Sequence, residues 1–215
     1  MPLGDLRPDP VALLARTAYL ELSLFEAASS VAARASDLAD REVVTRVAAR
    51  ILGQHTALVD LLTEQGEVPA VAMQPYAADI DRYWRRFGET GWHESVLTLH
   101  LATGLLNDFF AQLGAGLPGS LADRYCAVLT ADLGQESLVQ VLSAAIAGDR
   151  RMTSRLALWG RRIVGDTLLV ARSALDAVRD PSGVPVETEE RRVEPVLNDL
   201  IAAHTRRMDR LGLTA

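Results

Sequence analysis

Apolar residues recur at alternating spacings of three and four along four long segments of this chain, and this period predicts four helices that each bury one face. The predicted buried stripes of the first two segments are Leu14, Ala18, Glu21, Phe25, Ala28 and Ala32, and then Val44, Val47, Ile51, Gln54, Leu58 and Leu61. Those of the last two are Val96, Leu99, Thr103, Leu106, Phe110 and Leu113, and then Ala127, Ala131, Gly134, Leu138, Val141 and Ala145. The first three stripes each hold a polar residue near the middle, so the predicted interior is not wholly apolar.

Capping and turn residues divide the chain into helices and connections. Asp9 followed by Pro10 predicts the start of the first helix, Gly66 favours the end of the second, and Pro75 is expected to open a short helix inside a long connection. The stretch "DPSGVP" at 180–185 is a predicted loop. The predicted helices cover residues 10–35, 38–65, 75–87, 92–113, 121–147 and 149–179, and a last helix ends near residue 211.

The connectivity of these helices predicts the fold. Two close helix pairs joined by one long connection, residues 66–92, are typical of ferritin-like bundles, whereas simple up-down bundles have short loops throughout. We therefore predict an all-α fold: a ferritin-like four-helix bundle with a long crossover between its second and third helices, plus two additional C-terminal helices. A single domain over 1–215 is the simplest expectation, with the core bundle at about 9–147 and the C-terminal helices at about 149–211.

Composition agrees with a helical fold and limits the functions. Apolar residues make up 49% of the chain and aromatic residues only 5%, which favours helices packed through aliphatic side chains. The single Cys126 and the lack of an apolar leader predict a cytoplasmic protein. The apolar stretch 96–106 is too short to span a membrane and is interrupted by His100. A formal net charge of −6 argues against strong non-specific binding to nucleic acid.

The histidines do not fit the metal site that such bundles usually hold. A carboxylate-bridged di-iron site needs a Glu from each of two helices and a Glu-x-x-His pair from each of the other two, since a spacing of three aims both ligands at one metal pair. The residues three positions before His55, His93, His100 and His204 are Leu52, Thr90, Leu97 and Ile201. The standard site therefore cannot be built, and the histidines are expected to be exposed or packed.

Four stretches of the chain resemble a known family. They are "YLELSLFE" (19–26), "AMQPY" (72–76), "RLALWGRRIVGDTL" (155–168) and "AHTRRMDRLGL" (203–213). These stretches are similar to segments of actinobacterial ferritin-like proteins of the tRNA-(ms2io6A)-hydroxylase (MiaE)-like family, and the similarity extends over about residues 15–213. The resemblance implies a ferritin-like fold related to di-iron monooxygenases that hydroxylate a prenylated adenosine in tRNA.

The resemblance also implies where the metal ligands of that family would stand. In chain order these positions are occupied by Glu21, Ile51, Gln54, Thr103, Ala131 and Gly134. Only Glu21 keeps a carboxylate. The second helix offers Ile51 and Gln54 instead of Glu and His, with His55 one place along, and the third offers Thr103 instead of an acid. Since the same positions lie on the predicted buried stripes, we expect a vestigial site with no bound metal.

Glu21 is the unusual member of this set. A buried carboxylate needs hydrogen-bond partners or a raised pKa. Gln54 and Thr103 lie on neighbouring stripes and both can donate a hydrogen bond, so we expect them to bind the Glu21 carboxylate. Residual metal binding by Glu21, or an exposed Glu21, are the alternatives.

Two hypotheses about function follow. The first is a non-catalytic scaffold or partner protein without a cofactor, either as a homodimer or as a heterodimer with a metal-competent paralogue. The second is an active hydroxylase of the MiaE-like family that acts on prenylated adenosine in tRNA through an unusual di-iron site. The missing ligands favour the first hypothesis.

The stretch "RYWRRF" (82–87) is a candidate for contact with tRNA. Arg82, Arg85 and Arg86 alternate with aromatic residues, a pattern that suits phosphate binding and base stacking. At helical spacing, however, Tyr83 and Phe87 anchor one face while the arginines solvate the other. The second interpretation is the simpler, and contact with tRNA is the alternative.

Overall fold

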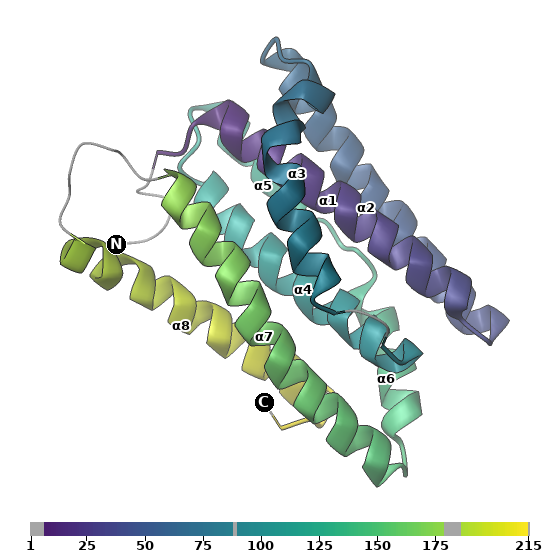
Figure 1. Cartoon of the computed structure of the whole chain (residues 1–215). Helices are drawn as coiled ribbons and strands as arrows, with labels where there is room; N and C mark the ends of the chain where they lie inside the picture. The colour runs from purple at the N-terminus through teal and green to yellow at the C-terminus, as the bar shows by residue number, and fades with distance from the viewer. Residues whose placement is uncertain (1–6, 88–89, 179–185, 215) are drawn as a thin grey trace.

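All regular structure in the described part of the chain is helical. The computed structural model describes residues 7–87, 90–178 and 186–214 (Figure 1). Its helices are α1 (Pro10–Arg34), α2 (Leu38–Glu64), α3 (Pro69–Arg85), α4 (Trp92–Gly114), α5 (Ser120–Leu129), α6 (Gln135–Ile146), α7 (Arg150–Val178) and α8 (Val186–Arg210). The all-α prediction is confirmed, and the predicted loop at 180–185 lies outside the described residues. Within the described residues, none of the helices combines the length and apolar character that a membrane span requires.

Four helical segments form the predicted bundle: α1, α2, α4 and the consecutive helices α5 and α6. α1 contacts both α2 and α4. α5 and α6 also contact both α2 and α4. α3 lies along α1 and carries the chain from the end of α2 back toward the end of the bundle where α2 began (Figure 1). α2 and α4 therefore run in the same direction, which is the long crossover that the sequence predicts.

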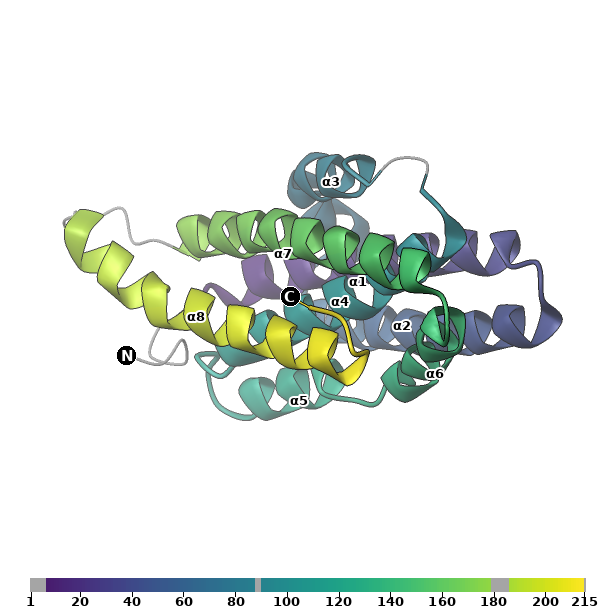
Figure 2. The same cartoon turned by 90° about the horizontal axis from the view of Figure 1, so that it is seen from below.

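α4 lies at the centre of the molecule. It contacts α1, α5, α6, α7 and α8, and its side chains are buried on almost every face. α7 and α8 cover the side of α4 that faces away from α2, as Figure 2 shows from below. The two C-terminal helices therefore complete the burial of α4, whose sequence is too apolar for a surface helix.

Side-chain caps set the starts of the first two helices. The Asp9 carboxylate accepts a 2.8 Å hydrogen bond from the Ala12 amide, and Pro10 occupies the first helical position, where no amide hydrogen is needed. The Asp37 carboxylate accepts from the amides of Ala39 and Asp40 in the same way. These local contacts explain why both helix starts are predictable.

The crossover helix is longer than predicted. α3 begins at Pro69, and Pro75 lies inside it instead of opening it. Pro69 also suits a first helical position, so the two prolines compete for the same role in the sequence. The prediction placed the helix start at Pro75, whereas the helix begins at Pro69.

The fourth helix of the bundle is broken, which contradicts the prediction of one helix over 121–147. α5 ends at Leu129 and α6 begins at Gln135. Between them Gly134 has a φ of 79°, a conformation that only glycine adopts readily, and its amide donates to the Asp132 side chain at 2.8 Å. The buried stripe predicted for this segment is wrong in its first half, because Ala127 and Ala131 are exposed, whereas Leu138 is buried as predicted. The buried apolar side chains are Tyr125, Leu129, Leu133, Leu138, Val139 and Leu142.

Candidate functional site

The centre of the bundle holds one carboxylate. Glu21 lies on α1 and is fully buried, as predicted, among side chains such as Leu14, Ala18 and Leu24. Neither carboxylate oxygen has a hydrogen-bond partner in the described part of the chain. Burial raises the pKa of Glu21 to about 8. Glu21 is therefore mostly protonated at neutral pH, which avoids an uncompensated charge in the core.

Gln54 does not bind Glu21, so that expectation was wrong. Its side-chain nitrogen donates a 2.6 Å hydrogen bond to the backbone carbonyl of Val128, and its side-chain oxygen accepts one from Asn107 at 3.2 Å. Asn107 also donates to the Leu129 carbonyl at 3.4 Å. The physical reason is the break in the fourth helix, because the carbonyls of Val128 and Leu129 lack the amide four residues on that a continuous helix would supply, and the Ala131 amide reaches Val128 only at 3.4 Å. Two side-chain amides supply the missing partners.

Thr103 does not bind Glu21 either. It is buried on α4, as predicted, but its hydroxyl has no partner among the described residues. The hydroxyl lies beside a pocket of about 470 Å³ that Asn107, Ala131 and Arg207 also line. Thr103 therefore lines the pocket next to the helix break and does not pair with Glu21.

The six positions at which the resemblance implies metal ligands do not form one site. Glu21, Ile51, Gln54 and Thr103 are buried in the bundle. The other two, Ala131 and Gly134, lie in the non-helical connection between α5 and α6, where Ala131 is exposed. An added Cβ at Gly134 would stand 2.7 Å from the Arg50 guanidinium, so a histidine there would also displace a neighbour. The fourth helix cannot present ligands to the centre from these positions.

The donor set at the centre does not fit a di-iron site. Such a site needs four carboxylates and two histidines. The buried carboxylates among the described residues are Glu21 and Glu94, and Glu94 lies in the first turn of α4, where it pairs with Arg155. Glu21 is therefore the one acid on the central stripes, beside the Gln54 amide and the Thr103 hydroxyl. In residues 7–87, 90–178 and 186–214 no group of three or more His, Cys, Asp or Glu side chains converges closely enough to hold a metal ion. The residues present therefore do not fit a di-iron cofactor.

Tyr125 fills part of the space beside Glu21, and the sequence analysis missed it. Its hydroxyl donates a 2.6 Å hydrogen bond to Thr17, since the single hydroxyl proton of Thr17 is already donated to the Leu13 carbonyl at 2.8 Å. Burial raises the pKa of Tyr125, and the nearby Glu21 adds to the shift. The sequence does hold a signal for this buried face, because Tyr125, Leu129 and Leu133 are spaced by four residues. The predicted stripe did not include them.

The histidines are packed into several places and do not converge on Glu21. His55 donates a 2.8 Å hydrogen bond to the Ala18 carbonyl of α1, and buried His100 donates to the Gln135 side chain at 2.6 Å. Burial lowers the pKa of His100 to about 4, and the same cause lowers that of His204 to about 4. Both rings are neutral at pH 7.

The candidate nucleic-acid residues lie near the end of α3. Arg82 pairs with Asp79 at 2.8 Å, Arg86 pairs with Asp166 of α7 at 3.0 Å, and Arg85 is exposed. The neighbouring Tyr83 and Phe87 are buried, as the simpler interpretation expects. A contact with tRNA through these arginines stays a prediction.

Comparison with known proteins identifies the fold family. A family model described as "Ferritin-like domain, actinomycetes" matches residues 7–180 of the chain, which includes the whole bundle and the crossover. No curated protein matches the chain.

Proposed function

Because the chain belongs to the ferritin-like domain family of actinomycetes, we propose that it is a metal-independent member, a non-catalytic scaffold or partner protein. The observation that carries the proposal is the hydrogen bonding of the Gln54 and Asn107 amides to the carbonyl end of α5. These two side chains stabilise a break in the helix on which the resemblance implies that metal ligands would stand. In this proposal, hydrogen bonds from Gln54 and Asn107 to α5 replace the metal contacts that would join the helices in a di-iron bundle.

The interior packing supports the same proposal. Ile51 is fully buried at a ligand position, and Tyr125 occupies bundle volume next to Glu21. The protonated form of Glu21 removes the charge that a metal would otherwise neutralise. A bundle with this interior is expected to fold without a metal ion, because apolar burial supplies the main driving force.

An outward stripe on α7 is the surface that best suits a partner. Leu158 and Leu169 are 64% and 52% exposed, and the eleven-residue separation places them on the same face of the helix, with exposed Gly165 between them. Exposed apolar residues that share a face are typical of association surfaces. A second copy of this chain or a metal-competent paralogue is the partner that we propose.

Urea unfolding in the presence of metals tests the metal-independent function. A metal ion that binds only the folded state at 100 times its Kd would raise the free energy of unfolding by about 2.7 kcal/mol. We expect no such increase with Fe(II) under anaerobic conditions or with Mn(II), compared with Ca(II). Stabilisation by Fe(II) or Mn(II) that disappears in Glu21→Gln would refute the proposal.

Sedimentation velocity tests the partner surface. If α7 mediates a homodimer, Leu158→Glu converts the dimer to a monomer, while Leu52→Glu on the outer side of α2 leaves it unchanged. A wild-type chain that is monomeric at every concentration excludes the homodimer and restricts the proposal to the paralogue, which is then mixed with this chain in the same measurement.

The second candidate is the MiaE-like hydroxylase. It is favoured by the four stretches of resemblance and by the retained Glu21, which is buried at a ligand position. Oxygen consumption by the iron-supplemented protein with a prenylated tRNA separates the two functions. The scaffold predicts no uptake above that of Glu21→Gln, whereas uptake that depends on both Glu21 and the tRNA supports the hydroxylase.

A further inference from the structure

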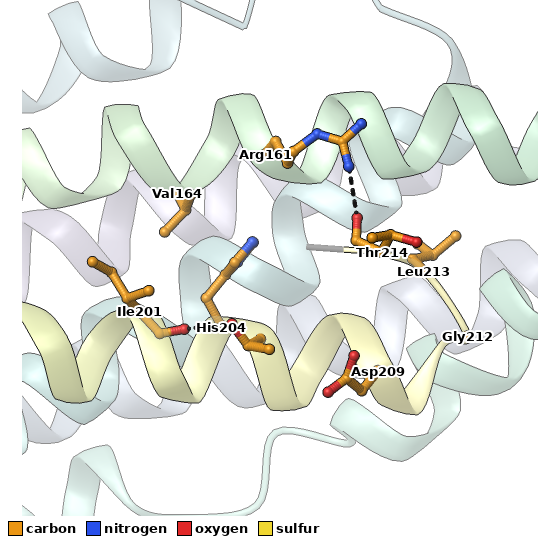
Figure 3. Close-up of a pocket in the computed structure, with 9 residues that line it drawn as sticks. Arg161, Val164, Ile201, His204, Asp209, Gly212, Leu213 and Thr214 are labelled. Carbon is orange, nitrogen blue, oxygen red and sulfur yellow. Dashed lines mark hydrogen bonds between the residues drawn. The ribbon is translucent and has the colours of Figure 1, made fainter.

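A pocket between α7, α8 and residues 212–214 lies outside the bundle and has no part in the proposed scaffold function. Its volume is about 770 Å³, within the range of small-molecule sites. Figure 3 shows that its two walls come from α7 and α8, and that the segment after α8 folds back between them. The lining combines apolar, charged and hydrogen-bonding side chains, which is the composition of a binding pocket.

His204 is the feature that points to a ligand. It is 2% exposed, and neither ring nitrogen has a hydrogen-bond partner in the described part of the chain. The side chain extends from α8 toward Val164 and Arg161 of α7, into the space between the two helices (Figure 3). Burial and the nearby Arg207 keep the ring neutral, so it offers one donor and one acceptor. An unsatisfied buried ring of this kind favours a polar occupant.

The pocket has an apolar end and a charged end. Val164 and Ile201 lie on one side of His204, and Arg161 and Asp209 lie on the other (Figure 3). Arg161 donates to the Thr214 carbonyl at 2.9 Å through one nitrogen. Arg161 and Asp209 are both exposed and both line the pocket, and no ion pair between them is present among the described residues.

We propose that this pocket binds a small zwitterion with an apolar side chain, such as an apolar amino acid or a short apolar peptide. Arg161 binds the carboxylate, because a guanidinium presents several donors in a fixed plane. Asp209 binds the ammonium group, and His204 exchanges a hydrogen bond with the polar backbone of the ligand. Val164 and Ile201 contact the apolar side chain. An anion alone would meet the Asp209 carboxylate, and a cation alone would meet Arg161, so a ligand with both charges fits best.

Calorimetric titration of the full chain tests this proposal with L-leucine and L-leucyl-L-leucine as probes. N-acetyl-leucine lacks the ammonium charge, leucinamide lacks the carboxylate, and glycine lacks the apolar side chain. We expect saturable binding of at least one probe, and at least about tenfold weaker binding of all three analogues, because each loses one class of contact. Binding of N-acetyl-leucine or leucinamide with the same affinity as leucine would overturn the zwitterion assignment, and no saturation by either probe would overturn the site.

Matched variants locate the binding. Arg161→Met and Asp209→Asn are each expected to weaken binding by about tenfold. Arg206→Met and Asp199→Asn change the same charges on exposed positions of α8 that do not line the pocket, so they are expected to bind as the wild type does. His204→Phe keeps the ring volume and removes the hydrogen bonds. Wild-type binding by all three pocket variants would show that the probes bind elsewhere, and an unchanged circular dichroism spectrum excludes misfolding as the cause of a loss.

Discussion

The side-chain amide of Gln54 on α2 donates a 2.6 Å hydrogen bond to the backbone carbonyl of Val128 on α5, one residue before that helix ends. This contact joins the two helices across the bundle. It also explains why the chain tolerates a helix break beside its core, because a buried carbonyl without a partner would cost free energy.

Replacement of Gln54 by leucine is expected to destabilise the protein by about 1–3 kcal/mol, because it removes the two hydrogen bonds that Gln54 makes to the Val128 carbonyl and the Asn107 amide. Each of these two groups would keep only one long contact of 3.4 Å, from the Ala131 amide and to the Leu129 carbonyl. Urea denaturation measures the change. Gln140→Leu on the exposed face of α6 is the matched control, and we expect it to stay within about 0.5 kcal/mol of wild type. A Gln54→Leu protein as stable as this control would show that the contact to α5 does not support the break.

The changes that Glu21→Gln and Gln54→Leu make to the free energy of unfolding are expected to be additive. The two side chains have no hydrogen bond in common, since Gln54 is bonded to Val128 and Asn107. A double-mutant cycle in urea should therefore give a coupling energy below about 0.5 kcal/mol. A coupling well above that value would mean that Gln54 does bind the acid.

Glu21 is expected to make the protein less stable as the pH rises. Its pKa of about 8 in the folded state lies above the ordinary value of 4.5, so the folded protein keeps a proton that the unfolded chain releases. The contribution to stability is complete below pH 4.5 and is lost as the pH rises through 8, at up to about 1.4 kcal/mol per unit. Glu21→Gln removes this dependence. Unfolding free energies of both proteins at pH 5.5 and 8 decide the matter, and equal slopes would show that Glu21 is not a buried neutral acid.

Gly114 is expected to be intolerant of alanine. An added Cβ would stand 2.1 Å from the Tyr125 ring, which is fully buried and bonded to Thr17. Overpacking of this kind typically costs about 1–3 kcal/mol. Gly53 on the exposed side of α2 is the control, because a Cβ there meets nothing within 4 Å. Gly53→Ala should stabilise the helix by about 0.5–1 kcal/mol. Thermal unfolding of both variants tests the contrast, and a Gly114→Ala protein at least as stable as the wild type would contradict the packing of Tyr125 on α4.

The sequence predicts most of the helices because their signals are local. Asp9 with Pro10 and Asp37 fix the starts of α1 and α2 through contacts within one turn. The crossover follows from the length of the connection after Gly66. The stripes of α1, α2 and α4 were also predicted, since Glu21, Gln54 and Thr103 are all buried where the period places them.

The break between α5 and α6 could not be predicted in the same way. The segment 121–147 contains no proline, and its apolar residues fit more than one helical phase. Gly134 and Asp132 are the only local signs of a turn, and the contacts that stabilise the break come from Gln54 and Asn107 on other helices. Partners of buried polar groups depend on such tertiary contacts, which explains why the expected bonds to Glu21 were wrong.

Elemental analysis tests the central account most directly. The chain is produced in iron- and manganese-supplemented cells, purified without chelator, and analysed by mass spectrometry of its metals beside Glu21→Gln. A metal-independent bundle predicts far less than one iron or manganese ion per chain in both proteins. A content close to two ions per wild-type chain that falls in Glu21→Gln would contradict the account.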